Sequence, residues 1–367
     1  MNYPTRSYLA TGLAVIALLL SIGCGSSSDS EPTPAKYQYS PPQKLSDGWE
    51  VNDAASVGFN VSLLEALINQ IIGGNYPEID GVIIVKNESL ILEHYFNGYG
   101  HSQKHELQSA VKSIDSALVG LAIQNGFISS PQELIYNHLP EYHQLDWSND
   151  KDKLTLQHLM TMQSGMECTD GTEGDCNSHI LNQQANWTRY TLKQEVIHQP
   201  GTRFSYFTGL NIVAHTLLEN VTNTSIDNFA VTHLFEPLGI TQVTWGHSSS
   251  GEALSAEMLP RDMAKFGQLY LNQGQWNGVQ IISADWIKNS TSEQVSRAQT
   301  GGEGYGFWWW RFRSNQKAVS YYAAMGAKGQ YIFIFPTLDL VVVFTGNEST
   351  GRPKELLENY ILKALQD

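Results

Sequence analysis

The chain has 367 residues, of which 22 are basic and 36 acidic, so its formal net charge is −14. An acidic chain lacks the basic surface that attracts nucleic acids, and we therefore expect no nucleic-acid partner. The length allows one large domain or a domain with a big insertion, because single cores stop growing at about 250–300 residues.

The N-terminus has the pattern of an export signal. One basic residue precedes an apolar run over 9–22, which is too short for a stable membrane span, and small residues then lead to Cys24. The stretch 20–24 resembles a bacterial lipobox, whose cysteine is lipidated and becomes the mature N-terminus. We expect 1–24 to be a lipoprotein signal peptide, and Cys24 to anchor the exported protein to the outer membrane, facing the periplasm.

The residues after Cys24 are rich in Ser and Pro, which predicts a flexible tether over 25–45 and a folded domain over 46–367. In that domain, helical spacing begins at Leu63, with Ser62 and Glu65 as a capping box, and ends at Ile72. Two apolar runs around 86–89 then predict a hairpin.

Helical periodicity follows over 106–126, and the pattern from 126 to about 284 is mostly helical with long connections. Strand character returns at 305–313, 318–326, 329–336 and 338–346, and an amphipathic helix is predicted over 354–365. Strands early and late with helices between them predict an α+β fold. We expect one antiparallel β-sheet flanked by helices, with a large, mostly helical insertion at about 126–284.

The helix over 106–126 carries Ser109 and Lys112 three residues apart, so the two are surface neighbours on one polar stripe. Burial disfavours the charged form of a lysine, and a neutral amine beside a hydroxyl can take its proton. This spacing therefore predicts a nucleophilic serine. The same spacing occurs at Ser148 and at Ser314, but both lie in polar connections.

Cys168 and Cys176 lie in a Gly- and Asp-rich stretch, where an exported protein most simply forms a disulfide. A zinc site with Asp170, Asp175 and His179 is the less favoured alternative, because no paired Cys/His spacing is present. The histidines form no His-Glu-x-x-His motif, and a Gly-x-Ser-x-Gly elbow and a phosphate-binding glycine loop are missing as well. We expect neither a metal nor another cofactor.

Taken in order, several stretches resemble the serine β-lactamase and penicillin-binding-protein superfamily, and within it class C-like esterases and the 6-aminohexanoate-dimer hydrolase group. They are SAVKSIDSALVGLAIQNG, LTLQHLMTMQSGM, PGTRFSYFTGLN, FEPLGI, PRDMAKFGQLYLNQGQW, GAKGQYIFIFP and LDLVVVFTGN. The resemblance covers nearly all of the chain after the tether. It implies a β-lactamase/transpeptidase-like fold and an acyl-enzyme on Ser109.

The family's second element, Tyr-x-Asn, is best matched by Tyr206 with Thr208 in place of the asparagine, because this stretch precedes a helix as in the family. The resemblance implies that Tyr206 carries a proton between Ser109, Lys112 and the leaving group. Literal Tyr-x-Asn matches at 95–97 and 270–272 are out of order or on an amphipathic helix.

The third element, Lys-Thr-Gly or His-x-Gly on a strand, aligns with Ala327, Lys328 and Gly329, so the usual first cation is missing. On a strand, Lys328 would point away from Ala327. The resemblance implies Thr208, Ala327 and Gly329 as substrate-binding residues. It also implies an oxyanion hole made of the Ser109 and Gln330 N–H groups.

The sequence thus predicts an exported serine hydrolase that acts on esters or amides as small molecules or short peptides. Without the cation, small esters or uncharged amides are favoured over β-lactams. A D-aminoacyl peptide amidase or β-lactamase is the alternative. An inactive cell-wall-binding lipoprotein on the same fold is the rival of another class.

Overall fold

We describe a computed structural model, in which residues 36–148, 150–301, 303–347 and 352–366 are defined. The chain divides into two units, Met1–Lys36 and Tyr37–Asp367, and the architecture given below is that of the second unit. Cys24 and the predicted signal peptide lie outside the described residues. Within the described ranges, no helix combines the length and apolar character that crossing a membrane requires.

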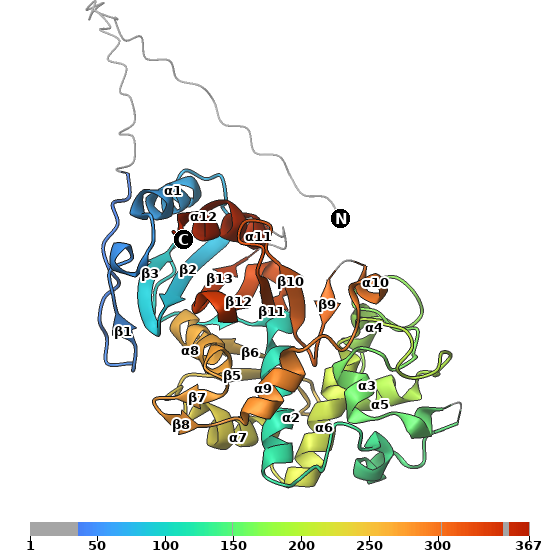
Figure 1. The fold of residues 1–367 in the computed structure, drawn as a ribbon. Coiled ribbons are helices and arrows are strands. Elements are labelled where there is room, and N and C mark those ends of the chain that lie inside the picture. Colours follow the sequence, from blue (N-terminus) through green and yellow to red (C-terminus); the bar gives the residue numbers. More distant parts are fainter. Residues whose placement is uncertain (1–35, 149, 302, 348–351, 367) are drawn as a thin grey trace, which may run out of the picture. The chain divides into compact units, whose positions relative to one another are not determined.

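An eight-stranded sheet forms the centre of the domain (Figure 1). All neighbouring strands are antiparallel except the first pair, which is parallel. In spatial order the strands are β1 (Glu50–Val51), β3 (Ser89–Tyr95), β2 (Ile79–Lys86), β13 (Leu340–Gly346), β12 (Gln330–Phe335), β11 (Ser320–Gly326), β10 (Trp310–Arg313) and β9 (Gly304–Tyr305). The early strands β1, β3 and β2 form one side of the sheet and the late strands β13 to β9 form the other, joined by the β2 and β13 pair, so the predicted α+β fold class is confirmed.

Both faces of this sheet are buried. On β12, Ile332 and Ile334 belong to one core, whereas Phe333 and Phe335 belong to the other, as the strand alternation requires. The second core is covered by α1 (Val61–Ile72), α11 (Arg352–Leu356), a π-helix (Leu357–Ile361) and α12 (Leu362–Ala364). The first core is covered by α2 (Val111–Gln124) and α8 (Pro260–Leu271). Because both faces of the sheet are buried, the sequences of strands such as β12 and β13 contain continuous apolar runs.

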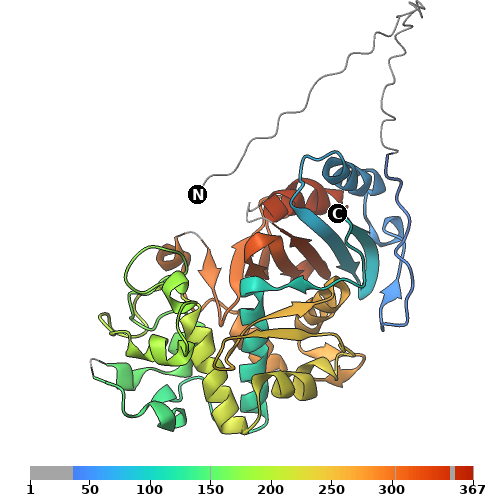
Figure 2. The ribbon, with the colours of Figure 1, turned by 180° about the vertical axis from the view of Figure 1, so that it is seen from behind.

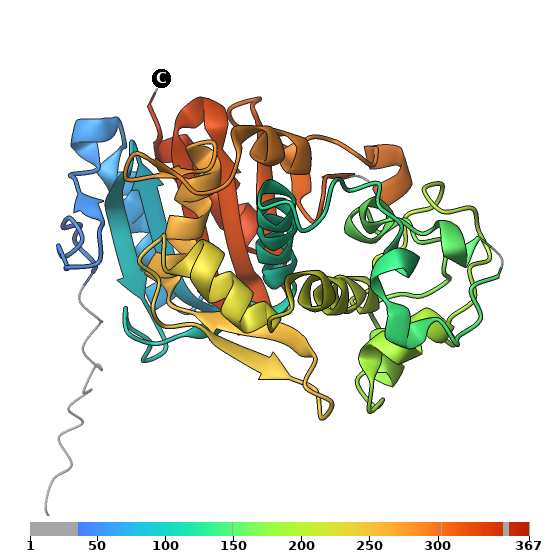
Figure 3. The same cartoon turned by 90° about the horizontal axis from the view of Figure 1, so that it is seen from below.

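The remaining elements make up a helix-rich part beside the sheet, with α2 between the two (Figures 2 and 3). Its helices are α3 (Leu156–Met160), α4 (Ser178–Leu181), α5 (Trp187–Lys193), α6 (Gly209–Thr222), α7 (Ile226–Ala230), a π-helix (Val231–Phe235), α9 (Ala284–Thr291) and α10 (Arg297–Thr300). The stretch expected to be mostly helical also holds strands β5 (Thr244–His247), β6 (Ala253–Met258), β7 (Gln275–Trp276) and β8 (Val279–Gln280). β6 pairs with β5 and with β4 (His105–Glu106).

Two local expectations were wrong. The N-cap of α1 is Asn60, whose side chain accepts a hydrogen bond from Ser62 N, so Ser62 lies inside the helix instead of capping it. The expected strand at 305–313 is interrupted: Trp308 has a φ of 60°, and a Cβ at Gly306 would lie 2.2 Å from Ser290 O. Close packing against the end of α9 bends the chain there, so only its two ends pair with neighbours.

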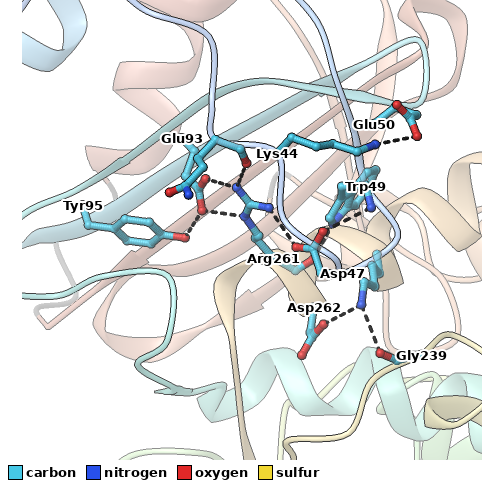
Figure 4. Close-up of polar contacts among 11 residues, drawn as sticks. Lys44, Asp47, Trp49, Glu50, Glu93, Tyr95, Gly239, Arg261 and Asp262 are labelled. Atoms are coloured by element: carbon cyan, nitrogen blue, oxygen red, sulfur yellow. Dashed lines mark hydrogen bonds and ion pairs between the residues drawn. The ribbon is translucent and has the colours of Figure 1, made fainter.

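A buried ion cluster holds the start of the domain against the sheet and α8 (Figure 4). The Arg261 guanidinium donates to both carboxylate oxygens of Glu93, to Asp47 Oδ2 (2.8 Å) and to Gln43 O (2.8 Å). Trp49 Nε1 donates to Arg261 O (3.2 Å). The cluster therefore joins the segment before β1, strand β3 and helix α8.

Candidate active site

Ser109 lies in a tight turn that leads into α2. A 3₁₀ turn over Gln108–Ala110 precedes the helix, and Gln108 has a φ of 51°, a left-handed conformation that is uncommon for a residue with a side chain. Leu107 N donates to Ala256 O (2.8 Å), which fixes the entry of this turn to β6. Strained backbone of this kind is concentrated at functional sites, and here it immediately precedes the predicted nucleophile.

Lys112 is directed toward Ser109, as its helical spacing predicts. Its Nζ lies 3.2 Å from Ser109 Oγ and 3.0 Å from Thr208 Oγ1, and the residue is only 3% exposed. The pattern at 148–151 forms no such pair, because Lys151 Nζ donates to the carbonyl oxygens of Asp146 and Leu192. The Ser109 and Lys112 side chains thus form the contact that proton transfer needs.

Tyr206 lies in the loop before α6, where the sequence reasoning placed the second element. The centroid of its ring is 5.1 Å from Lys112 Nζ, and Trp310 stacks on the ring with centroids 5.8 Å apart. The two literal Tyr-x-Asn matches lie elsewhere: Tyr95 donates to Glu93 in the ion cluster, and Tyr270 is fully buried in the core. Of these three tyrosines, Tyr206 is the one beside the Ser109 and Lys112 pair.

Thr208 connects Lys112 to a carboxylate that sequence reasoning did not assign to the site. The Thr208 hydroxyl accepts from Lys112 and donates to Asp170 Oδ2, while Thr208 N donates to Asp170 Oδ1 (2.6 Å). Two protein partners thus already occupy the hydroxyl that was expected to contact substrate. Asp170 is held in a loop closed by a disulfide between Cys168 and Cys176. In the sequence, the sign of this role is an acidic residue between the two cysteines.

The third element differs from the strand that the sequence predicted. Residues Ala327–Gly329 form a 3₁₀ turn between β11 and β12, and Lys328 has a φ of 61°. Strand alternation therefore does not set the direction of Lys328, and that part of the reasoning was wrong. The Gln330 side chain donates to Gly346 O (2.6 Å), at the end of β13.

Gly326, the last residue of β11, packs directly on the nucleophile turn. A Cβ at this position would lie 2.2 Å from Leu107 O and 3.1 Å from Ala110 N. No side chain fits in such a space, so glycine is what allows the sheet edge and the turn around Ser109 to approach each other.

A cavity of about 270 Å³ opens where these elements meet. Its lining residues are Tyr206, Trp310, Met325, Gly326, Ala327, Gly329 and Tyr331. Trp310 is one of the aromatic residues in this lining. Tyr305, whose ring packs edge-on against Trp310, is buried and is not part of the lining. Among the described residues, no group of three or more His, Cys, Asp or Glu side chains is placed to hold a metal ion.

A second buried polar group lies one turn after Lys112 and joins α2 to α6. Asp115 Oδ1 is 2.9 Å from His215 Nε2, and Asn211 Nδ2 donates to Asp115 Oδ2 (3.1 Å). Burial alone would lower the pKa of His215, but the Asp115 carboxylate outweighs it and the pKa is raised. This pair fixes the position of α2, which carries Lys112, relative to α6, which follows Tyr206.

Comparisons with known proteins show which family and fold the chain shares. The family model described as Beta-lactamase matches residues 69–366. The 6-aminohexanoate-dimer hydrolase of Paenarthrobacter ureafaciens is 23% identical over 292 residues, which cover 72% of this chain and 71% of that protein. Protein flp of Staphylococcus aureus strain MW2 is 22% identical over 191 residues.

The match to Protein flp covers 48% of this chain but only 37% of that protein. Among solved structures, the octameric penicillin-binding protein homologue from Pyrococcus abyssi superimposes with a TM-score of 0.65 at 18% identity, covering 82% of this chain and 76% of that chain. At this identity the likeness establishes the fold. The family match spans most of the domain and includes the Ser109 turn, Tyr206 and the β11 edge, so the chain belongs to the Beta-lactamase family.

Proposed function

We propose that the protein is a serine hydrolase that acts on small esters or uncharged amides through an acyl-enzyme on Ser109. The observation that carries the proposal is the buried Lys112 amine, 3.2 Å from the Ser109 hydroxyl and beside the Tyr206 ring. An amine held this close to a hydroxyl in a dry site can act as its general base. Family membership supports hydrolase chemistry of the esterase or amidase kind.

In the proposed acylation step, neutral Lys112 takes the Ser109 proton as Oγ bonds to the substrate carbonyl carbon. The tetrahedral intermediate then collapses, the bond to the leaving alcohol or amine breaks, and the proton passes from Lys112 through the Tyr206 phenol to that leaving group. In deacylation, water attacks the acyl carbon and gives one proton to the same relay. The acid product leaves, and Ser109 regains its proton.

The tetrahedral intermediate needs backbone donors. We propose Ser109 N–H as the first and an amide of the turn after β11 as the second. Sequence reasoning placed the second donor at Gln330, but the cavity is lined by Ala327 and not by Gln330. Ala327 also follows directly after Gly326, which touches the nucleophile turn. We therefore favour Ala327 N–H as the second donor.

Substrate preference follows from the charge of the cavity wall. No Lys, Arg or His is among the described residues that line it, and its aromatic members are Tyr206, Trp310 and Tyr331. A substrate carboxylate would find no charge-assisted partner in this wall, whereas apolar acyl or alcohol groups would bury aromatic surface. This composition supports neutral substrates over acidic ones such as cephalosporins.

The test is labelling with a fluorophosphonate probe, read by intact-mass spectrometry on the purified full-length protein. Wild type should gain one adduct and Ser109→Ala none. Ser148→Ala is the matched control, because Ser148 has the same spacing to a lysine but lies in an exposed connection, and it should label like wild type. An equal adduct on Ser109→Ala would reject Ser109 as the nucleophile, whereas no adduct on wild type would reject the hydrolase and favour a binding protein on this fold.

A further inference from the structure

The Asp170 carboxylate accepts hydrogen bonds from Thr208 and takes no part in the reaction steps described above. We infer that Asp170 is a positioning residue that orients the Lys112 amine through the Thr208 hydroxyl. This inference rests on the proposed function, because it concerns how the general base is aimed at Ser109. It is carried by three contacts: Lys112 to Thr208 (3.0 Å), Thr208 Oγ1 to Asp170, and Thr208 N to Asp170 (2.6 Å).

The direction of these hydrogen bonds is fixed by chemistry. An ionised carboxylate only accepts, so the single Thr208 hydroxyl proton must point to Asp170. The same hydroxyl oxygen can then only accept, and it accepts an N–H of Lys112. One N–H of the amine is thereby held toward Thr208 and away from Ser109. When the amine is neutral, its lone pair is left free to face the Ser109 hydroxyl at 3.2 Å.

Asp170 is itself held firmly against the segment that carries Tyr206 and Thr208. Asp170 N donates to Tyr206 O (2.8 Å), and the Ser205 hydroxyl donates to Cys168 O. The disulfide closes the loop behind these contacts. The carboxylate and the loop before α6 are therefore tied together from both sides, which gives the acceptor a defined position relative to Thr208.

The charged and titratable groups that surround this link come from three elements. Lys112 faces it from α2, Tyr206 from the loop before α6, and Tyr305 from β9. Burial raises the pKa of Tyr305, and the nearby Tyr206 and Asp170 raise it further, so Tyr305 stays neutral in the working range. Asp115, the carboxylate on α2, is paired with His215. Asp170 is the carboxylate that reaches Lys112 through a shared hydroxyl.

The sharpest variant is Asp170→Asn, which keeps the shape but supplies one acceptor where Thr208 presents two donors. The amide NH₂ must then face either the Thr208 N–H or its hydroxyl, so the fixed direction of the link is lost. Thr208→Val removes the hydroxyl, and Thr208→Ser keeps it. Asp175→Asn is the matched control, since it removes the same charge from an exposed position of the same disulfide loop.

The measurement is the rate of fluorophosphonate acylation of the full-length protein from pH 5 to 10, with circular dichroism to check folding. Asp170→Asn and Thr208→Val should lose about ten- to hundredfold in the plateau rate, the typical effect of one charge-assisted hydrogen bond. In Asp170→Asn the acid limb of the pH–rate profile should also move to lower pH. A nearby negative charge favours the protonated amine, and this variant removes that charge. Thr208→Ser should restore most of the rate, and Asp175→Asn should match wild type.

The outcomes separate this inference from the proposed function. If wild type is not labelled, the proposed function fails. If wild type is labelled and folded Asp170→Asn has the same plateau rate and the same acid limb, Asp170 has no positioning role while the proposed function stands. Asp170→Asn could also show a lower plateau rate but an unchanged acid limb, while Thr208→Ser is as slow as Thr208→Val. Asp170 would then have a structural role alone, and the inference would be overturned.

Discussion

Replacing Arg261 by methionine should destabilise the domain without touching its chemistry. Methionine keeps the apolar stem, but it leaves the carboxylates of Glu93 and Asp47 without their cation. The side chains of Arg261 and Glu93 are only 4% and 8% exposed, and removing one partner of such a buried pair costs about 3–5 kcal/mol. At ~2.1 cal/mol/K per residue, a domain of about 330 residues has an unfolding entropy of ~0.7 kcal/mol/K, so Tm should fall by about 4–7 °C.

The assay is thermal unfolding of wild type and Arg261→Met by circular dichroism, with probe acylation measured well below Tm. Arg189→Met is the control, because Arg189 is exposed and its loss should shift Tm little. The hydrogen bond from Arg261 lowers the pKa of Asp47 even though burial opposes this. A lowered native pKa adds stability above the unfolded value, so the Tm difference should shrink below about pH 4. A Tm within 1 °C of wild type, or a lost acylation rate in folded protein, would refute the reasoning.

Four further outcomes follow from the site and its surroundings. Lys112→Ala should slow acylation by about 10²–10⁴-fold, the usual loss with a general base, and wild-type rates in stopped-flow labelling would refute that role. Wild type should hydrolyse short aryl esters with a higher kcat/KM than a chromogenic cephalosporin, and Ala327→His should narrow that ratio; an unchanged ratio would show that position 327 does not set the preference. A fatty-acid analogue fed to cells should label wild type and not Cys24→Ser, whereas a labelled variant would disprove the lipobox prediction. Finally, Asp115 raises the pKa of His215, so this pair stabilises the fold below about pH 6.5 and loses that effect as pH rises through the raised pKa. The difference in Tm between wild type and His215→Asn should therefore be smaller at pH 9 than at pH 6, and an equal difference at both pH values would contradict the prediction.

Sequence reasoning succeeded where the signal was local. The helix α1 ends at Ile72, the residue at which the apolar spacing predicted its end. Continuous apolar runs in β12 and β13 marked strands, because residues on both of their faces enter cores. The closeness of Ser109 and Lys112 could likewise be read from the sequence, although α2 begins at Val111 and not at 106: Ser109 lies in the 3₁₀ turn that runs into α2, and this turn also brings side chains three residues apart together.

It failed where a long-range contact decides the conformation. Nothing near Trp308 in the sequence predicts a left-handed residue, because the bend comes from Gly306 packing on the end of α9. The role of Asp170 is equally hidden, since its partner Thr208 lies 38 residues further on. The same holds for Arg261 and Glu93, which lie 168 residues apart. Residue types alone do not show which of several carboxylates such a partner will meet.

The contact between Gly326 and the carbonyl of Leu107 also has a consequence for biogenesis. The two residues are separated by more than half of the chain, and β11, the strand that ends in Gly326, pairs with β10 before it and with β12 after it in the sequence. Contacts of such high sequence separation form slowly, because the loop between them must close first. The turn around Ser109 therefore cannot acquire its final shape on a nascent or truncated chain. Probe reactivity of Ser109 would accordingly report on completion of the whole domain, and it could serve as a readout of folding as much as of catalysis.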